Sequence, residues 1–190
     1  GSSFPLNRTM TTELLRFETM HYNVVAAQMS RGKTERATAY AIGAVASTLG
    51  RFAMDVCLFI NQNVGFISFP DEYTTGSSIM PHKKNPDVFE LLRAKCNRLQ
   101  ALPTDIILIM NNLPSGYFRD LQIIKELFIP AVNELKECIK MATYIVSRME
   151  VNENILDDTR YDAMFSVEEV NRLASAGMPF RDAYKKVGLD

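Results

Sequence analysis

The side chains best suited to chemistry lie in one polar stretch of the chain. Residues 75–87 read TGSSIMPHKKNPD, in which a serine pair follows a glycine and precedes a histidine, two lysines and an asparagine. A serine hydroxyl is a weak base in water, and nearby backbone N–H groups and a cation would lower its pKa. With Lys83 as that cation and Asn85 as a neutral donor, Ser77 could abstract a proton next to a carboxylate.

Two other interpretations of this stretch compete with a catalytic one. It could be a plain connector, because Gly, Ser and Pro are common in turns. It could also cradle a phosphate, but it lacks the second glycine and the Lys-Ser/Thr ending of a P-loop, and it follows no strand. A connector does not need a hydroxyl, a cation and an amide in fixed order, so the stretch is the main functional lead.

Long helices are predicted on both sides of this stretch. Between Thr34 and Asn61 the apolar residues recur at three- and four-residue steps without a proline, which predicts one long helix. Its many Ala and Gly residues would let other helices approach closely, as in a bundle core. After the polar stretch, Asn85 can cap a second long helix that begins at Pro86, and Pro103 can kink it.

Two further long segments also have the helical period. A third helix is predicted within residues 115–149, with Pro130 inside its apolar pattern, and the segment from about Thr9 to Ser30 is expected to be helical. Every long element is therefore a helix. The predicted fold class is all-α, a long-helix bundle with a small helical appendage.

The appendage is predicted after Val151, where short apolar groups alternate with turn residues. SVEEVNRLASAG predicts one short helix, capped by Ser166 with Glu169 in the capping-box position and ended by Gly177. FRDAYKKVG predicts a second, ended by Gly188. The pair could be a DNA-reading helix-turn-helix, but its three cations are more typical of a solvated face.

Composition limits the classes of partner and site. With 190 residues and 47% hydrophobic content, the chain can bury a sizeable core. Its net charge of -1 gives no overall field for nucleic acid or an acidic membrane. Three distant cysteines and two histidines indicate neither a disulfide framework nor a zinc site, and the thiols favour a reducing compartment. The sequence shows no apolar run of the ~20 residues that a membrane span needs. It also shows no charged-then-apolar leader at the N-terminus, so a cytoplasmic location is expected.

The motif GSSIMPHKKNP resembles the signature loop of the fumarase/aspartase superfamily, lyases that form fumarate by breaking a carbon–nitrogen or carbon–oxygen bond. Within it, TGSSIMPHKKNPD followed by LPSGYFRDLQIIKE most closely resembles the argininosuccinate lyase family. GMPFRDAYKKVG is similar to the start of that family's small C-terminal domain. The resemblance covers essentially the whole chain. It implies that residues 1–150 are part of the central helical-bundle domain and that residues 151–190 are the start of the small C-terminal helical domain.

The resemblance also implies roles for individual residues. Ser77 matches the catalytic serine that takes the proton from the succinate Cβ. Lys83 and Asn85 match residues that hold the succinate carboxylates and stabilise the aci-carboxylate intermediate, which makes Lys83 the second predicted catalytic residue. Three more residues match substrate-binding positions: Tyr117, Gln122 and Lys125. Each of these three has a plainer interpretation when taken alone, respectively an interfacial aromatic, a neutral helix former and a solvated charge.

The reaction implied by the resemblance is the splitting of argininosuccinate into arginine and fumarate, in arginine biosynthesis and with no metal or organic cofactor. It further implies a homotetramer in which each active site is composed from three subunits. The acid-side histidine lies outside this chain in the family, so the isolated chain is expected to be inactive. Another fumarate-releasing lyase and a non-catalytic helical oligomer resembling lens crystallins remain as alternatives.

Several positions depart from the family pattern, among them Phe118–Arg119 and Ile123–Ile124. His82 stands where many relatives have glutamine, so no catalytic role is given to it. The segment QMSRGKTER differs from the usual Ser-Asp-Arg-Asp, and therefore no role is carried over to Arg31 or Lys33.

Overall fold

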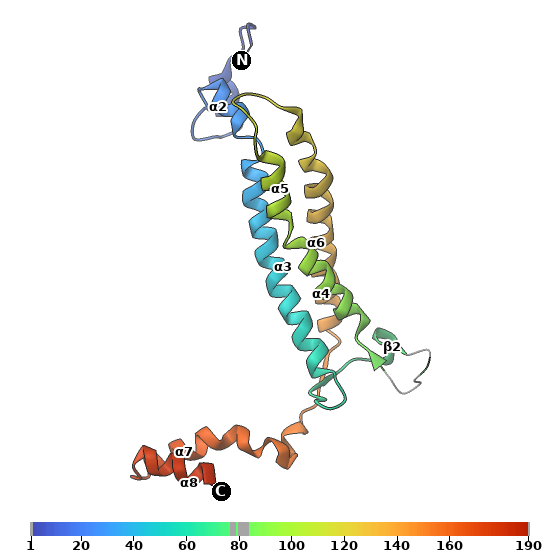
Figure 1. Ribbon diagram of the computed structural model, residues 1–190, viewed down its shortest axis with the longest axis vertical. Helices are drawn as coiled ribbons and strands as arrows, with labels where there is room; N and C mark the ends of the chain where they lie inside the picture. The colour runs from blue at the N-terminus through green and yellow to red at the C-terminus, as the bar shows by residue number, and fades with distance from the viewer. Residues whose placement is uncertain (1, 77–78, 80–83, 190) are drawn as a thin grey trace.

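The computed structural model describes residues 2–76, 79 and 84–189 of the chain (Figure 1). Ser77 and Lys83, the two predicted catalytic residues, lie outside these described residues, as do Ser78 and His82. The flanking residues on both sides of the polar stretch are described.

Three long rods form the bundle: the first is α3 (Lys33–Phe59), the second is α4 (Asp87–Leu99) followed by α5 (Leu102–Met110), and the third is α6 (Ile124–Val146). α3 runs alongside α4 and α5, and α6 packs against all three (Figure 1). The all-α class and the long helix predicted from Thr34 to Asn61 are confirmed.

Small residues on α3 explain why the rods pack closely. Ala39, Ala46 and Ala53 are fully buried. A Cβ added to Gly50 would lie 3.3 Å from the Cβ of Cys96 on α4. A larger residue at such positions would push the helices apart, so the small side chains set the helix spacing.

The start of the second rod differs from the prediction. Pro86 occupies the N-cap of α4 and no side chain caps it, while Asn85 belongs to the short strand β3 (Lys84–Asn85). Asn85 was therefore wrongly predicted as a cap, because its backbone pairs with β2 (Thr75–Gly76) instead. The predicted kink is a break between α4 and α5, with Pro103 in the first turn of α5, where its missing N–H costs no hydrogen bond.

The third rod begins later than predicted. α6 starts at Ile124, after the short 3₁₀ helix η2 (Arg119–Gln122), and Pro130 lies within α6. The chain from residue 115 to 118 is therefore not helical. Tyr117 lies in this non-helical approach to η2.

The N-terminal segment is two short helices rather than the single one predicted. α1 (Arg8–Leu14) is followed by a turn in which Arg16 has a φ of 57°, and α2 (Val24–Met29) begins only after Asn23. The Asn23 side chain accepts hydrogen bonds from two backbone N–H groups of α2, at 2.9 and 3.0 Å. This N-cap starts a new helix at a point where the apolar period alone suggested continuity.

Short strands connect the chain segments that follow two of the long helices. β1 (Ile67–Ser68) pairs antiparallel with β4 (Glu150–Val151), which joins the segment after α3 to the segment after α6. Three further 3₁₀ helices are η1 (Asp71–Tyr73), η3 (Ile155–Asp157) and η4 (Thr159–Phe165).

The C-terminal helices form a pair beyond the end of the bundle (Figure 1). α7 (Ser166–Ser175) packs against α8 (Phe180–Leu189). Phe165, not Ser166, is the N-cap of α7, and Glu169 binds Arg172 at 2.6 Å instead of completing a capping box.

The ends of this helix pair agree with the prediction at one glycine and differ at the other. Gly177 follows the C-cap of α7 with a φ of 98°, as predicted, whereas Gly188 lies inside α8 and does not end it.

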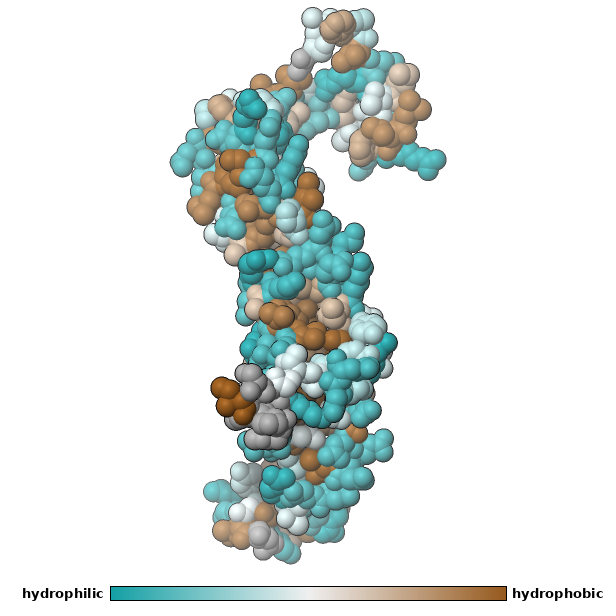
Figure 2. All heavy atoms as spheres, turned by 90° about the vertical axis from the view of Figure 1, so that its right-hand side faces the viewer, coloured by the Kyte–Doolittle hydropathy of each residue, from teal (hydrophilic) through white to brown (hydrophobic). Residues whose placement is uncertain are grey.

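Part of the bundle surface is apolar (Figure 2). Figure 2 shows hydrophobic side chains in patches along one face of the molecule. The segment Val24–Phe59 is long and apolar enough for a membrane span by length and composition, which the sequence analysis did not anticipate. One face of α3 packs on α4 and α5, as in a bundle core helix. The exposed large hydrophobic residues of the long helices are Tyr40, Val45, Met54, Leu58, Leu91, Leu108, Ile129, Ile139, Met141 and Tyr144.

Candidate functional site

The two ends of the polar stretch are held side by side. Thr75 pairs with Asn85 and Gly76 with Lys84 in the β2–β3 ladder. The Thr75 hydroxyl also donates a hydrogen bond to the carboxylate of Asp87, and the Lys84 ammonium forms an ion pair with Asp71. These contacts close the base of the loop that carries the predicted catalytic residues.

A pair of tyrosines anchors the segment that leads into this base. The hydroxyls of Tyr73 on η1 and Tyr144 on α6 lie 3.4 Å apart. The guanidinium carbon of Arg148 lies 3.6 Å from the ring centroid of Tyr144 and 5.6 Å from that of Tyr73. The hydrogen bond with Tyr144, followed by that with Glu72, raises the pKa of Tyr73 to about 12, so Tyr73 is a neutral phenol near neutral pH.

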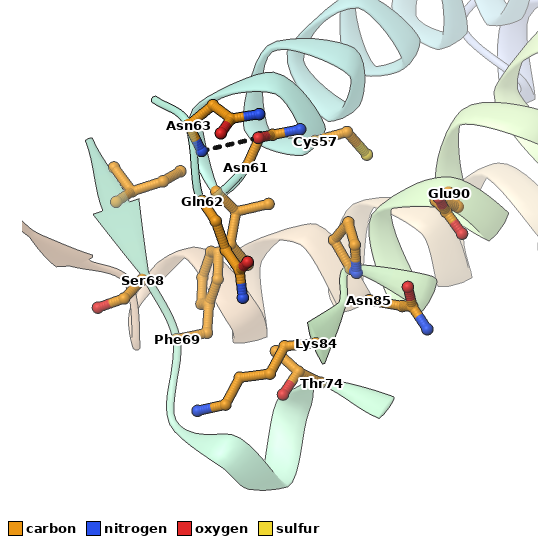
Figure 3. A pocket seen from close by; sticks show the side chains of 13 residues that line it. Cys57, Asn61, Gln62, Asn63, Ser68, Phe69, Thr74, Lys84, Asn85 and Glu90 are labelled. Carbon is orange, nitrogen blue, oxygen red and sulfur yellow. Dashed lines mark hydrogen bonds between the residues drawn. The ribbon is translucent and has the colours of Figure 1, made fainter. Parts of the chain in front are cut away.

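A cavity of about 420 Å³ with a mixed polar and apolar lining lies beside the loop base (Figure 3). Asn61, Gln62 and Asn63 enter it from the turn after α3, and Asn85 and Glu90 enter from the start of the second rod. The Asn61 side-chain oxygen accepts a hydrogen bond from the backbone N–H of Asn63 at 2.9 Å, which fixes the orientation of that amide.

The lining of this cavity suits an oxygen-rich ligand. Carboxamide groups supply N–H donors without adding charge, while Glu90 adds a carboxylate and the Lys84 ammonium at the edge is paired with Asp71. Asn85, predicted to hold a succinate carboxylate, is half-buried in this lining. The amides of residues 61–63 were missed by sequence reasoning, because nothing in their spacing distinguishes them from the polar end of a helix.

The other predicted binding residues form a second cluster. The side-chain amide of Gln122 donates to the Tyr117 hydroxyl at 3.1 Å. The guanidinium carbon of Arg31 lies 4.9 Å from the centroid of the Tyr117 ring. The hydrogen bond from Gln122, and then the Arg31 guanidinium, lower the pKa of Tyr117 below its usual value.

Lys125 completes the predicted set at the start of α6. Its side chain is exposed, and it follows Gln122 by three residues, which places the two on the same face of the helical turn. Gln122 thus contacts Tyr117 directly, and Lys125 lies one helical turn further along the chain. Arg31 joins them from the α2–α3 junction, which no local sequence signal could reveal because it is distant along the chain.

The β2–β3 ladder and the segment that follows α5 lie at opposite ends of the bundle (Figure 1). Asn85 precedes α4, and Tyr117 follows α5. The α4–α5 rod covers residues 87–110, which at 1.5 Å per residue spans roughly 35 Å. One copy of the chain therefore does not bring Asn85 and Tyr117 to the same small molecule.

Within residues 2–76, 79 and 84–189, no group of three His, Cys, Asp or Glu side chains is arranged to hold a metal ion.

Comparison with known sequences gives a consistent family. A family model described as lyase matches residues 6–101. The chain is 70% identical over all its 190 residues to argininosuccinate lyase of Phocaeicola vulgatus, and 69% identical to that of Bacteroides fragilis. Argininosuccinate lyase of Xylella fastidiosa is 40% identical over 185 residues, or 97% of this chain. The chain spans 43%, 42% and 41% of these three relatives, respectively.

Solved structures share the fold at low sequence identity. EDDS lyase in complex with formate matches 99% of this chain and 37% of its own chain, with a TM-score of 0.80 and 21% identity. The 3-carboxy-cis,cis-muconate lactonizing enzyme from Pseudomonas putida matches 96% of this chain and 40% of its own, with a TM-score of 0.70 and 18% identity.

Proposed function

Since this chain belongs to the lyase family of the fumarase/aspartase superfamily, we propose that it is part of an argininosuccinate lyase. The complete enzyme would split argininosuccinate into arginine and fumarate in arginine biosynthesis. Its high identity to enzymes of that name supports the proposal. The closed base of the loop at residues 75–76 and 84–85, beside an amide-lined cavity, is the structural observation that carries it.

The proposed reaction is a β-elimination. Ser77 takes the proton from the succinate Cβ, and the electron pair moves into the adjacent carboxylate to give an aci-carboxylate, which Lys83 and Asn85 stabilise. The carbon–nitrogen bond then breaks, the electrons of that bond pass to the leaving guanidino nitrogen, and an acid from outside this chain protonates it. The ladder from Thr75 to Asn85 would hold the base and the carboxylate donors in register.

The distance between Asn85 and the Tyr117 cluster in one copy of the chain suggests that several copies build the active site together. We propose that Asn85 of one copy and the Tyr117 cluster of another meet at one substrate in a homotetramer. The roughly 35 Å between them in one copy supports this arrangement, because a substrate of this size cannot span it. The apolar side chains exposed on the long helices supply surface for such packing.

Other parts of the proposal follow from the same family. Residues 1–150 would belong to the central bundle domain and residues 151–190 to the start of a small C-terminal domain, in a cytoplasmic enzyme. The 190-residue chain alone would not turn over substrate, because its site also needs the acid and further copies.

The test is a fumarate-release assay on the full-length protein that contains this sequence. Argininosuccinate should produce fumarate absorbance, whereas adenylosuccinate and aspartate should not. Release from either of these two but not from argininosuccinate would assign the protein to a different fumarate-releasing lyase. Release from none of the three would support a non-catalytic helical oligomer and overturn the proposal.

A further inference from the structure

We infer that Arg31 is a further substrate-binding residue, whose guanidinium receives a carboxylate at the Tyr117–Gln122 cluster. The inference rests on the proposed function, because it deepens the recognition of argininosuccinate. Neither the motifs in the sequence nor the family resemblance gave Arg31 a role.

The backbone at Gly32 fixes the position of Arg31. Gly32 has a φ of 80° and is buried, and a Cβ there would lie 2.8 Å from the Sδ of Met110 and 3.2 Å from the Cδ1 of Ile124. The α2–α3 junction is thus pressed against the end of α5 and the start of α6. Since Arg31 directly precedes this contact, its side chain is held beside the segment that carries Tyr117.

The Arg31 cation lacks a carboxylate partner in the described part of the chain. It is half-buried, and none of the ion pairs found among the described residues includes it. Partial burial of a guanidinium removes water that the charge would otherwise bind, and stacking on an aromatic ring restores only part of that loss. A ligand carboxylate would supply the missing partner.

The geometry of the stacked guanidinium suits that ligand. A guanidinium that lies over a ring keeps its N–H donors in its own plane, at the edges, where a carboxylate can accept two parallel hydrogen bonds. The guanidinium carbon of Arg31 lies 4.9 Å from the centroid of the Tyr117 ring, and Arg31 also hydrogen-bonds the Tyr117 side chain. A guanidinium has five N–H donors, so further donors remain for a ligand carboxylate.

Tyr117 adds a donor to the same place. Its oxygen accepts the hydrogen bond from Gln122, so its own hydrogen remains to be donated to a ligand. The lowered pKa of Tyr117 makes that hydroxyl a stronger donor. Arg31 and Tyr117 thus offer convergent donors, with Lys125 on the turn that follows.

The chemistry of the substrate selects which carboxylate is bound. Lys83 and Asn85 are proposed to hold the carboxylates of the succinyl part, which leaves the α-carboxylate of the arginine part. We therefore assign Arg31 to the α-carboxylate, and its contribution is to ground-state binding rather than to proton transfer. Its removal should raise KM and leave kcat nearly unchanged.

A comparison of arginine binding with agmatine binding distinguishes carboxylate binding by Arg31 from a purely structural support of Tyr117. Both molecules carry the guanidino group, but agmatine lacks the α-carboxylate. In calorimetric titrations of the full-length protein, Arg31→Ala should weaken arginine binding roughly 10- to 100-fold, the loss expected for a charged hydrogen-bonded pair, and leave agmatine binding unchanged. Arg31→Lys, which keeps the charge but loses the planar fork, should fall between wild type and Arg31→Ala.

The matched control is Arg51→Ala, which removes an exposed arginine further along α3. It should bind arginine as the wild type does. Equal loss of arginine and agmatine binding in Arg31→Ala would mean that Arg31 only braces Tyr117, and it would overturn the inference. Equal arginine affinity in wild type and Arg31→Ala, including no binding by either, would overturn it as well.

The titration does not depend on turnover, so the inference and the proposed function can fail separately. A wild-type protein that binds arginine through Arg31 but releases no fumarate from argininosuccinate would contradict the proposed reaction and leave the carboxylate site intact. If Arg31→Ala failed to fold, as judged by circular dichroism, the Arg31→Lys titrations would decide the question by the same comparison of arginine with agmatine.

Discussion

Asn85 and Tyr117 lie at opposite ends of the α4–α5 rod, roughly 35 Å apart along its axis. Each has neighbours suited to binding an anion: Asn85 lines an amide-rich cavity, and Tyr117 accepts a hydrogen bond from Gln122 beneath the Arg31 guanidinium. In the proposed enzyme, a second copy of the chain would supply the half-site that each of these residues lacks. The exposed apolar surface of the rods is consistent with that arrangement.

Lys125 is expected to contribute to substrate binding. In the full-length protein, Lys125→Ala should weaken binding by about 1.5–3 kcal/mol, the range for a lost charged hydrogen bond, and appear mainly as a raised KM. Lys140→Ala is the control, because Lys140 is an exposed lysine on the same helix that pairs only locally with Glu137. Unchanged KM and kcat in Lys125→Ala would return Lys125 to the role of a solvated helix charge.

Gly32 is predicted to be the glycine of α2–α3 that tolerates substitution least. Gly32→Ala should lower the free energy of unfolding by about 1–2 kcal/mol, because an L-residue resists a φ of 80°. Gly43→Ala on the same rod should be neutral or stabilising by up to about 1 kcal/mol, since its Cβ would meet neighbours only at ordinary contact distances of 3.8 and 3.9 Å. Urea titration measures both, and a Gly43 variant less stable than the Gly32 variant would contradict the packing described here.

The buried thiol of Cys96 predicts a loss of stability at high pH. Burial, and then Cys138 beside it, raise the pKa of Cys96 to about 12 from an ordinary value of 9.0. Below the ordinary value both states keep the proton, so the contribution of Cys96 to stability is complete. Between pH 9.0 and about pH 12 the Cys96 thiol loses its proton only in the unfolded chain, and this ionisation favours unfolding.

The measurement compares the wild type with Cys96→Ala at about pH 8 and about pH 10.5. The stability advantage of the wild type in urea titration should shrink by up to about 2 kcal/mol over that interval. An advantage that stays constant or grows with pH would mean that the thiol ionises as easily in the folded protein as in the unfolded one.

Sequence reasoning succeeded where a signal repeats along the chain. The three- and four-residue apolar period of α3 fixed its extent to within two residues at each end, because many buried positions contribute to one pattern. Single-residue predictions were weaker. Asn85 and Ser166 have the right side chains for caps, but strand pairing engages Asn85 and the 3₁₀ helix η4 runs directly into Ser166.

The candidate site was predicted only in part for a related reason. Tyr117, Gln122 and Lys125 are close in sequence and stay close in the structure. Arg31 reaches them through the contact of Gly32 with Met110 and Ile124, which depends on how three helices pack. No local pattern records such a contact, so only the folded chain reveals it.

Ser77 is expected to be the base of the reaction. Ser77→Ala in the full-length protein should keep the wild-type melting temperature within a few degrees, because the sequence predicts Ser77 in a polar loop, where a residue has little packing to lose. Turnover should fall by at least about 10²–10⁴-fold, the contribution of a positioned general base. Ser78→Ala, which removes the same atom from the neighbouring residue, should be less damaging. The reverse order of the two variants would show that the base is wrongly assigned.

The most direct test of sites shared between copies is to mix two inactive full-length variants. Ser77→Ala loses the loop function, and a Gln122→Ala/Lys125→Ala double variant loses the opposite half-site. An equal mixture of the two variants is dissociated and reassembled. If the two half-sites of one active site come from different copies, random assortment places two intact halves together in about a quarter of the sites. The mixture should then restore about a quarter of the wild-type fumarate release. If both halves came from the same copy, the mixture would release fumarate no faster than the average of the two variants alone, and that result would contradict the account.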